Sequence, residues 1–133
     1  MRCTGLDHVN LRVADAERSL RFYRDLLRLQ PERLEKFRAG ETSLLTLRIN
    51  SGSIIHLRPT DGFVAPRAEE LSAAWDHLAL SVEGTMDELV AELQRHGIPL
   101  DVEPFDAYGA LGMGRAVYVR DPDGYRVELK TAR

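Results

Sequence analysis

The feature that most constrains this chain is a repeat of about seventy residues, marked by polar side chains inside apolar strands. His8 and His77 each follow an aspartate at the start of an alternating strand, 69 residues apart. His56 and Glu128 each lie in the middle of a later strand of the same two halves, 72 residues apart. A period of this kind indicates one structural unit used twice. The sequence therefore predicts a duplicated scaffold with a side chain of the metal-ligand type at two matching points of each half.

Length and composition limit what this scaffold can be. The 133 residues fit one compact domain, and a hydrophobic content of 44% is enough to fill a core. No apolar run approaches the ~18 residues of a membrane span, and residues 1–4 lack the apolar character of a signal peptide. We therefore expect a soluble cytoplasmic protein. Its single cysteine, Cys3, cannot form an internal disulfide, so a metal site must use nitrogen and oxygen ligands.

Charge argues against large anionic partners. The 18 basic and 21 acidic residues are interspersed and give a net charge of −3. A protein that binds nucleic acid or a membrane surface usually carries a concentrated basic patch instead. The sequence therefore predicts a small-molecule substrate, with neither nucleic acid nor membrane as a partner.

The pattern of apolar and turn residues predicts the same order of elements in each half: one strand, one helix and three further strands. The first half predicts strands at residues 6–13, 32–37, 42–49 and 53–59, with a helix from an Asp15 cap through Arg28. The second half predicts strands at residues 75–82, 101–105, 115–120 and 125–131, with a helix opened by a Thr85–Glu88 capping box and ended by Gly97. We therefore expect an α+β fold of two tandem βαβββ modules in one domain, 1–133. Module 1 spans about 4–60, the linker about 61–73 and module 2 about 74–131.

Strand alternation places the four polar residues on one kind of surface. Successive side chains of a strand point to opposite faces, so the aliphatic neighbours of each candidate pack against the helix while the candidate faces away. If the mixed sheet of each module curves, the faces that carry the candidates line a metal-binding cup. Three imidazoles and one carboxylate suit Zn, Ni, Co, Fe or Mn, whereas Ca and Mg prefer oxygen ligands. The predicted ligands are His8, His56, His77 and Glu128.

Several motifs together resemble the vicinal oxygen chelate superfamily, which includes glyoxalases, bleomycin-resistance proteins and extradiol dioxygenases. They are the paired Asp-His strand starts, the helix segment 20–27 and the final segment 118–129. The stretch 108–115 resembles the glycine-rich loop of single-domain glyoxalase-like members. The resemblance covers nearly the whole chain and implies the same four metal positions. It also implies a homodimer, because modules of this superfamily often pair across a dimer, with the metal held either within one chain or between two chains.

His56 is where the chain departs from the patterns of the superfamily. Glyoxalase I has a glutamate there and the epimerase a glutamine, whereas dioxygenases and fosfomycin enzymes use two histidines and one glutamate, here His8, His77 and Glu128. A neutral imidazole with a pKa near ~6.5 suits a catalytic base, but coordination would occupy the nitrogen that a base needs. His56 is therefore expected to be either the fourth ligand or a catalytic base beside the ion.

The resemblance implies a divalent-metal-dependent enzyme that stabilises an oxyanion of a small chelating substrate, as a lyase, isomerase or thiol transferase. Two alternatives stay open: an Fe(II) extradiol dioxygenase, and a resistance protein that sequesters a drug without catalysis. Three side chains, predicted to reach the cup, are expected to bind substrate: Arg12, Arg58 and Tyr118.

Overall fold

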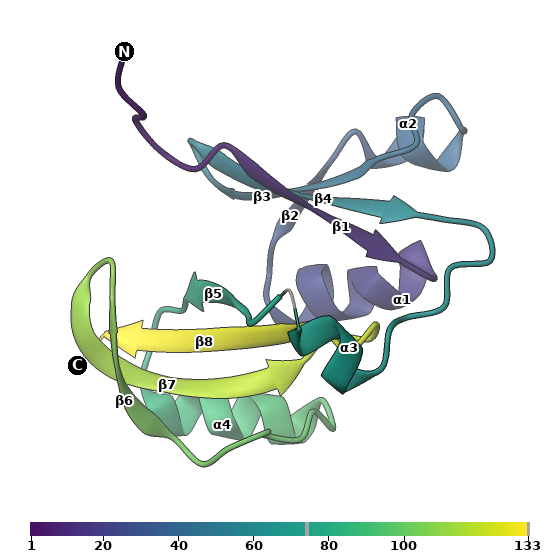
Figure 1. Ribbon diagram of the computed structural model, residues 1–133. Coiled ribbons are helices and arrows are strands. Elements are labelled where there is room, and N and C mark those ends of the chain that lie inside the picture. Colours follow the sequence, from purple (N-terminus) through teal and green to yellow (C-terminus); the bar gives the residue numbers. More distant parts are fainter. Residues whose placement is uncertain (74, 133) are drawn as a thin grey trace. The chain divides into compact units, whose positions relative to one another are not determined.

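The computed structural model describes residues 1–73 and 75–132. The chain forms two compact units, Met1–Ala65 and Pro66–Arg133. Each unit contains a four-stranded mixed sheet and one main helix, which confirms the α+β fold of two βαβββ modules (Figure 1).

The sheet of the first unit has the strand order β1-β4-β3-β2. Its strands are β1 (His8–Val13), β2 (Gln30–Glu32), β3 (Leu45–Asn50) and β4 (Ser53–Pro59). β1 runs parallel to the central strand β4, and the remaining pairs are antiparallel. The core-facing side chains of this sheet alternate with polar ones. The buried residues on the core face are Leu11, Val13, Leu45, Leu47, Ile55 and Leu57.

The helix of the first unit begins at its predicted cap. The Asp15 side chain accepts a hydrogen bond from the backbone N–H of Arg18 at 2.9 Å. The helix α1 (Ala16–Leu20) continues as a wider π-helical turn, η1 (Arg21–Leu26), in which the N–H of Leu27 donates to the carbonyl of Phe22. Such a widened turn changes the angle between neighbouring side chains. Here the adjacent aromatic residues Phe22 and Tyr23 are both buried, with their rings 5.0 Å apart.

Both units end their main helix with a residue in the left-handed conformation. In the second unit this residue is Gly97 at φ +67°, and the N–H of Ile98 reaches back to the carbonyl of Leu93. This is the usual arrangement of a helix that ends on glycine. In the first unit the matching residue is Arg28 at φ +61°, twenty residues after His8 as Gly97 is after His77. The two units therefore share the left-handed backbone conformation at the helix end, although only the second unit has a glycine there.

We expect Arg28→Gly to stabilise the protein. A left-handed residue with a side chain costs roughly 1–2 kcal/mol, and the greater freedom of glycine in the unfolded chain offsets about 0.5–1 kcal/mol of that. The free energy of unfolding in urea should therefore rise by about 0.5–1 kcal/mol. Gly97→Ala is the matched control and should lower it. A decrease for Arg28→Gly would show that contacts of the arginine side chain outweigh the backbone strain.

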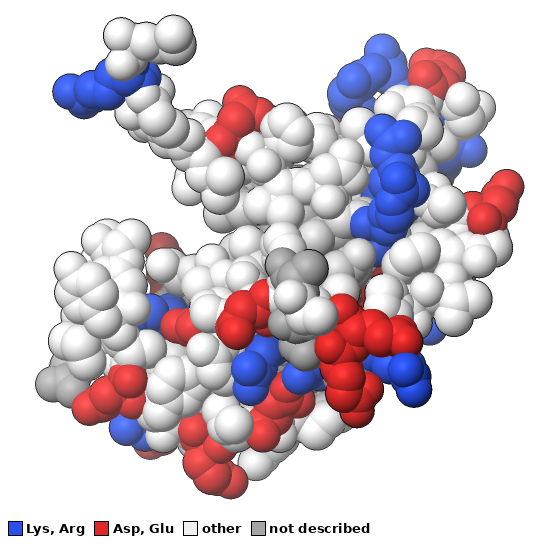
Figure 2. Space-filling model, in the orientation of Figure 1, with Lys and Arg blue, Asp and Glu red and all other residues white. Residues whose placement is uncertain are grey.

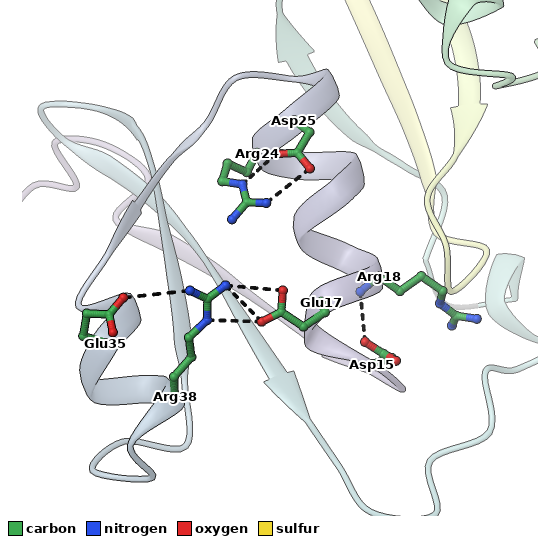
Figure 3. Close-up of polar contacts among 7 residues, drawn as sticks. All are labelled: Asp15, Glu17, Arg18, Arg24, Asp25, Glu35 and Arg38. Carbon is green, nitrogen blue, oxygen red and sulfur yellow. Dashed lines mark hydrogen bonds and ion pairs between the residues drawn. The ribbon is translucent and has the colours of Figure 1, made fainter.

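The strand predicted at residues 32–37 is wrong beyond Glu32. Arg33 takes the left-handed conformation at φ +55°, which ends the strand, and a short helix, α2 (Leu34–Arg38), follows. Figure 3 shows how Arg38 joins α2 to α1, because its guanidinium contacts Glu17 at 3.2 Å and Glu35 at 3.8 Å. The contact between Arg38 and Glu17 joins residues twenty-one positions apart. The periodicity of a short segment gives no information about such a contact.

The sheet of the second unit repeats the arrangement with the order β5-β8-β7-β6. Its strands are β5 (Leu78–Ser81), β6 (Phe105–Gly109), β7 (Gly112–Arg120) and β8 (Arg126–Ala132). β5 runs parallel to the central strand β8, as β1 does to β4. The helix α4 (Met86–Arg95) lies along one face of the sheet (Figure 1) and starts with the predicted Thr85–Glu88 capping box. Its buried residues Leu89 and Leu93 confirm the amphipathic pattern.

Two predicted segments of the second unit differ from the structure. The strand predicted at residues 101–105 is wrong up to Pro104, because proline has no N–H for a ladder and β6 begins only at Phe105. The glycine-rich stretch 108–115 is a hairpin between β6 and β7 rather than a loop. Gly112 makes its turn at φ +84°, and a Cβ on Gly114 would clash with the carbonyl oxygen of Thr131. The glycines of this stretch therefore have structural roles.

The segment predicted as a linker contains a short helix, α3 (Ala68–Ser72). None of the helices in the described part of the chain has both the length and the apolar character needed to cross a membrane. Figure 2 shows acidic and basic side chains mixed over the face that it draws, as the interspersed charges of the sequence suggest.

Candidate metal centre

The first candidate pair, His8 and His56, lies on neighbouring parallel strands. In the register of β1 and β4, Asn10 pairs with His56, and His8 precedes Asn10 by two residues. His8 and His56 therefore share the face of the sheet that is opposite to the core residues Ile55 and Leu57. Their rings meet edge to face, with centroids 5.0 Å apart. The first unit thus brings two imidazoles together, as the sequence predicted.

The second pair, His77 and Glu128, occupies the matching strand positions of the second unit. His77 lies one residue before β5, whose residue Ala79 pairs with Glu128 in the middle of β8. The His77 Nε2 is 3.2 Å from a carboxylate oxygen of Glu128. Only 6% of the surface of Glu128 is exposed, whereas the His77 side chain is about a third exposed. The second unit therefore places an imidazole beside a buried carboxylate.

The three histidines also agree in which ring nitrogen contacts the protein. The Nδ1 atoms of His8 and His77 lie 2.6 Å and 2.5 Å from the carboxylates of Asp7 and Asp76. The Nδ1 of His56 lies 3.0 Å from the hydroxyl oxygen of Thr46. A carboxylate can only accept, so the proton of a neutral His8 or His77 lies on Nδ1. Nε2 is then the nitrogen that presents a lone pair.

This arrangement fits the donor chemistry of a metal ion. Metal-bound histidines almost always donate their second ring N–H to a carboxylate, a carbonyl or water, which fixes the tautomer and the ring orientation. In the second unit, Nδ1 of His77 already faces one carboxylate, so its Nε2 and the Glu128 carboxylate face each other as two acceptors. Such a pair needs a proton or a cation between its atoms. A divalent ion would satisfy both.

The local environment shifts the pKa of three groups of the site. Burial and the nearby charge of His8 lower the pKa of His56, which favours the neutral imidazole that a metal requires. The hydrogen bond from His77 lowers the pKa of Asp76 and keeps it ionised. Burial, together with the negative charge of Glu128, raises the pKa of Tyr118 and keeps its hydroxyl protonated. The neutral His56 and the ionised Asp76 are the forms that metal binding would need.

The predicted substrate residues lie on the same faces as the ligands. Arg12 pairs with Arg58 in the register of β1 and β4, two residues beyond the Asn10–His56 pair. Arg58 is exposed, and Arg12 contacts the hydroxyl of Thr60 at 3.4 Å. Tyr118 pairs with Glu128 across β7 and β8. The structure therefore places two cations beside His56 and one phenol beside Glu128.

Each unit supplies a pair of ligand-type residues rather than a complete site. Within residues 1–73 and 75–132, no three histidine, cysteine, aspartate or glutamate side chains gather into a group able to hold a metal. An ion shared by the two pairs therefore stays a prediction.

Sequence reasoning missed the residues that surround the ligands. Thr46 and Arg126 were not singled out, and the two aspartates were used as markers of the repeat rather than as partners of the imidazoles. A usable signal was present for Thr46, because it precedes His56 by ten residues, as Tyr118 precedes Glu128. Arg126 gave no such signal. Its guanidinium carbon lies 4.0 Å above the Tyr118 ring.

Comparison with known proteins confirms the resemblance. Residues 5–129 match the Glyoxalase/Bleomycin resistance protein/Dioxygenase superfamily. The chain belongs to this superfamily. It is 30% identical to a probable lactoylglutathione lyase of Synechocystis, over 92% of this chain and 91% of the relative. It is 26% identical to the virulence protein STM3117 of Salmonella typhimurium, over 93% and 81% of the two chains.

Solved structures agree with this membership of the glyoxalase superfamily. The trypanothione-dependent glyoxalase I of Leishmania major superposes with a TM-score of 0.68 and 28% identity, over 97% of this chain and 87% of that one. The relatives thus include proteins named as lyases and one named only for virulence. Superfamily membership is shown, whereas the reaction has to be argued from the site.

Proposed function

We propose that this chain is a divalent-metal-dependent enzyme of the glyoxalase superfamily, whose ion is held by His8, His77 and Glu128 together with His56. The observation that carries the proposal is the shared orientation of the three imidazoles. Each has a protein oxygen at Nδ1, which leaves Nε2 for an ion. Glu128 is the one anionic member of the set and is buried, where its charge favours a bound cation.

A bound divalent ion would supply Lewis-acid stabilisation to an oxygen of the substrate that becomes negatively charged. The protein side chains have separate tasks. Asp7 and Asp76 hold the rings of His8 and His77 through Nδ1. Arg58, exposed on the face that carries His56, is suited to bind an anionic group of the substrate. We therefore expect a small substrate with two adjacent oxygens and an acidic group.

The names of the relatives favour lyase or isomerase chemistry, because four of them are called lactoylglutathione lyases or probable ones. A reaction of that kind needs a base to remove a proton beside a carbonyl. His56 is the candidate, since burial lowers its pKa and keeps it neutral as a base must be. Its Nε2 is available either to the ion or to that proton.

Activity screening of the metal-loaded protein tests this proposal. The substrates are the hemithioacetal of methylglyoxal and glutathione, fosfomycin with a thiol, and a catechol under oxygen. We expect turnover in the first or second assay that disappears after chelation and returns with added metal. Turnover of the catechol would identify a dioxygenase instead. Tight binding of a drug such as bleomycin without any turnover would identify a sequestering protein.

We also propose that the protein is a homodimer. Modules of this superfamily often pair across a dimer, and the exposed side of the β6–β7 hairpin is apolar, with Tyr108, Leu111 and Met113 largely solvent-exposed. Light scattering at micromolar concentration should give a mass near twice the 15.0 kDa of one chain. Leu111→Asp should shift the mass toward that of a single chain. A monomer that retains its metal would contradict this prediction.

A further inference from the structure

The two ligands in the central strands, His56 and Glu128, share a feature that the metal set does not use. Each lies directly opposite a hydroxyl residue of the neighbouring antiparallel strand. Thr46 of β3 pairs with His56 of β4, and Tyr118 of β7 pairs with Glu128 of β8. In both units the hydroxyl residue precedes its ligand by ten positions. The duplicated scaffold therefore repeats a pair of residues, not the ligand alone.

The hydroxyl of Thr46 holds the ring of His56 at Nδ1, so that Nε2 is the nitrogen left facing away from it. Its Oγ1 lies 3.0 Å from Nδ1 of the ring, and Thr46 is buried with 8% of its surface exposed. A hydroxyl accepts as well as donates, so the Thr46 oxygen can accept a hydrogen bond from an N–H at Nδ1. The lone pair of a neutral His56 then lies on Nε2. Without this partner the ring could rotate or change tautomer at little cost.

Tyr118 is held firmly enough to fix the carboxylate of Glu128. Its ring centroid lies 5.1 Å from that of Phe105 and 5.3 Å from that of His77, and the guanidinium of Arg126 covers its face at 4.0 Å. Tyr118 pairs with Glu128 in the register of β7 and β8, and a hydrogen bond to this carboxylate is among the causes, after burial and its negative charge, that raise the pKa of the Tyr118 hydroxyl. A phenol confined by three neighbours loses little further freedom when it makes that bond. It therefore restricts the carboxylate to a narrow range of orientations.

We infer that Thr46 and Tyr118 are matched positioning residues, which hold His56 and Glu128 in the orientation that a divalent ion requires. This inference rests on the proposed function, because it concerns the same ligands. In this inference Tyr118 orients the carboxylate of Glu128, whereas the sequence predicted that it contacts the substrate. Partners of this kind, which touch a ligand but not the metal, are commonly worth about 10–100-fold in metal affinity.

The test compares the metal affinity of variants that lose only the hydroxyl. Thr46→Val and Tyr118→Phe nearly preserve volume, and each should weaken Zn or Co binding by about 10-fold or more in a chelator competition. Thr46→Ser keeps the hydroxyl and should restore the affinity of the parent. With Co bound, the visible absorption of both deficient variants should change, since the geometry of the coordinating side chains changes. If Thr46→Val does not fold, Thr46→Ala is measured in its place.

Two controls separate positioning from general stability. Thr131→Val removes a buried hydroxyl of β8 that contacts the carbonyl of Arg115, so it should lower the unfolding midpoint while leaving metal affinity unchanged. Tyr108→Phe removes an exposed phenolic hydroxyl and should change neither. Parent-like affinity and spectra in both Thr46→Val and Tyr118→Phe would overturn the inference while leaving the proposed function intact. A parent that binds no metal would overturn both.

Discussion

Glu128→Gln is expected to lose most of its metal. The substitution keeps the volume of the side chain but removes the one anionic group of the predicted ligand set. A directly bound ligand should matter more than an outer partner, so we expect a loss of affinity beyond the roughly 10–100-fold typical of outer partners. The metal content after dialysis against a weak chelator measures it. His8→Ala and His77→Ala should behave alike.

The controls for Glu128→Gln address charge and folding. Glu83→Gln removes an exposed negative charge from the same unit and should leave metal content unchanged. The metal-free Glu128→Gln protein should unfold no earlier than the metal-free parent, because a buried amide is easier to accommodate than a buried carboxylate. Full metal occupancy of Glu128→Gln after dialysis would show that Glu128 is not a ligand.

His56→Ala distinguishes the two roles of His56. If His56 is the fourth ligand, the variant should bind metal more weakly. If His56 is a base beside the ion, the remaining three ligands should keep the metal while turnover falls by roughly 10²–10⁴, the usual contribution of a positioned acid or base. Metal content and turnover are measured on the same preparation. Parent-like values of both would remove His56 from the site.

His56→Glu provides the complementary gain of function. It restores the ligand set that the resemblance associates with glyoxalase I and adds a carboxylate able to act as a base. We expect this variant to retain metal and to isomerise the hemithioacetal of methylglyoxal faster than the parent. Thr46 can still donate to the new carboxylate, because a hydroxyl serves either partner. Full metal occupancy without this gain would show that the choice of substrate depends on other residues of the ligand face.

Strand periodicity was sufficient to predict on which face of its own sheet each ligand-type residue lies. The alternation of Val9, Leu11 and Val13 with His8 and Asn10 fixes the face of β1, and the register of β1 and β4 bears this out. The capping box at Thr85 and the cap at Asp15 were equally local and equally readable. Features set by side chains near one another in sequence could thus be predicted.

Features set by distant contacts could not be predicted in this way. The helix α2 replaces a predicted strand, and its Arg38 contacts Glu17 on α1. The hydrogen bond between Thr46 and His56 likewise depends on the pairing of β3 with β4, which periodicity alone does not give. Arg28 shows a third limit, because a left-handed conformation was recognisable from a glycine at position 97 but not from an arginine.

The central claim is that the pairs His8–His56 and His77–Glu128 hold one ion together. The most direct test is the number of metal ions bound per chain in two double variants, His8→Ala with His56→Ala and His77→Ala with Glu128→Gln. The account predicts one ion per chain in the parent and almost none in either double variant, since neither pair provides enough ligands alone. Retention of one ion by either double variant would contradict the account, because the remaining pair would then be sufficient.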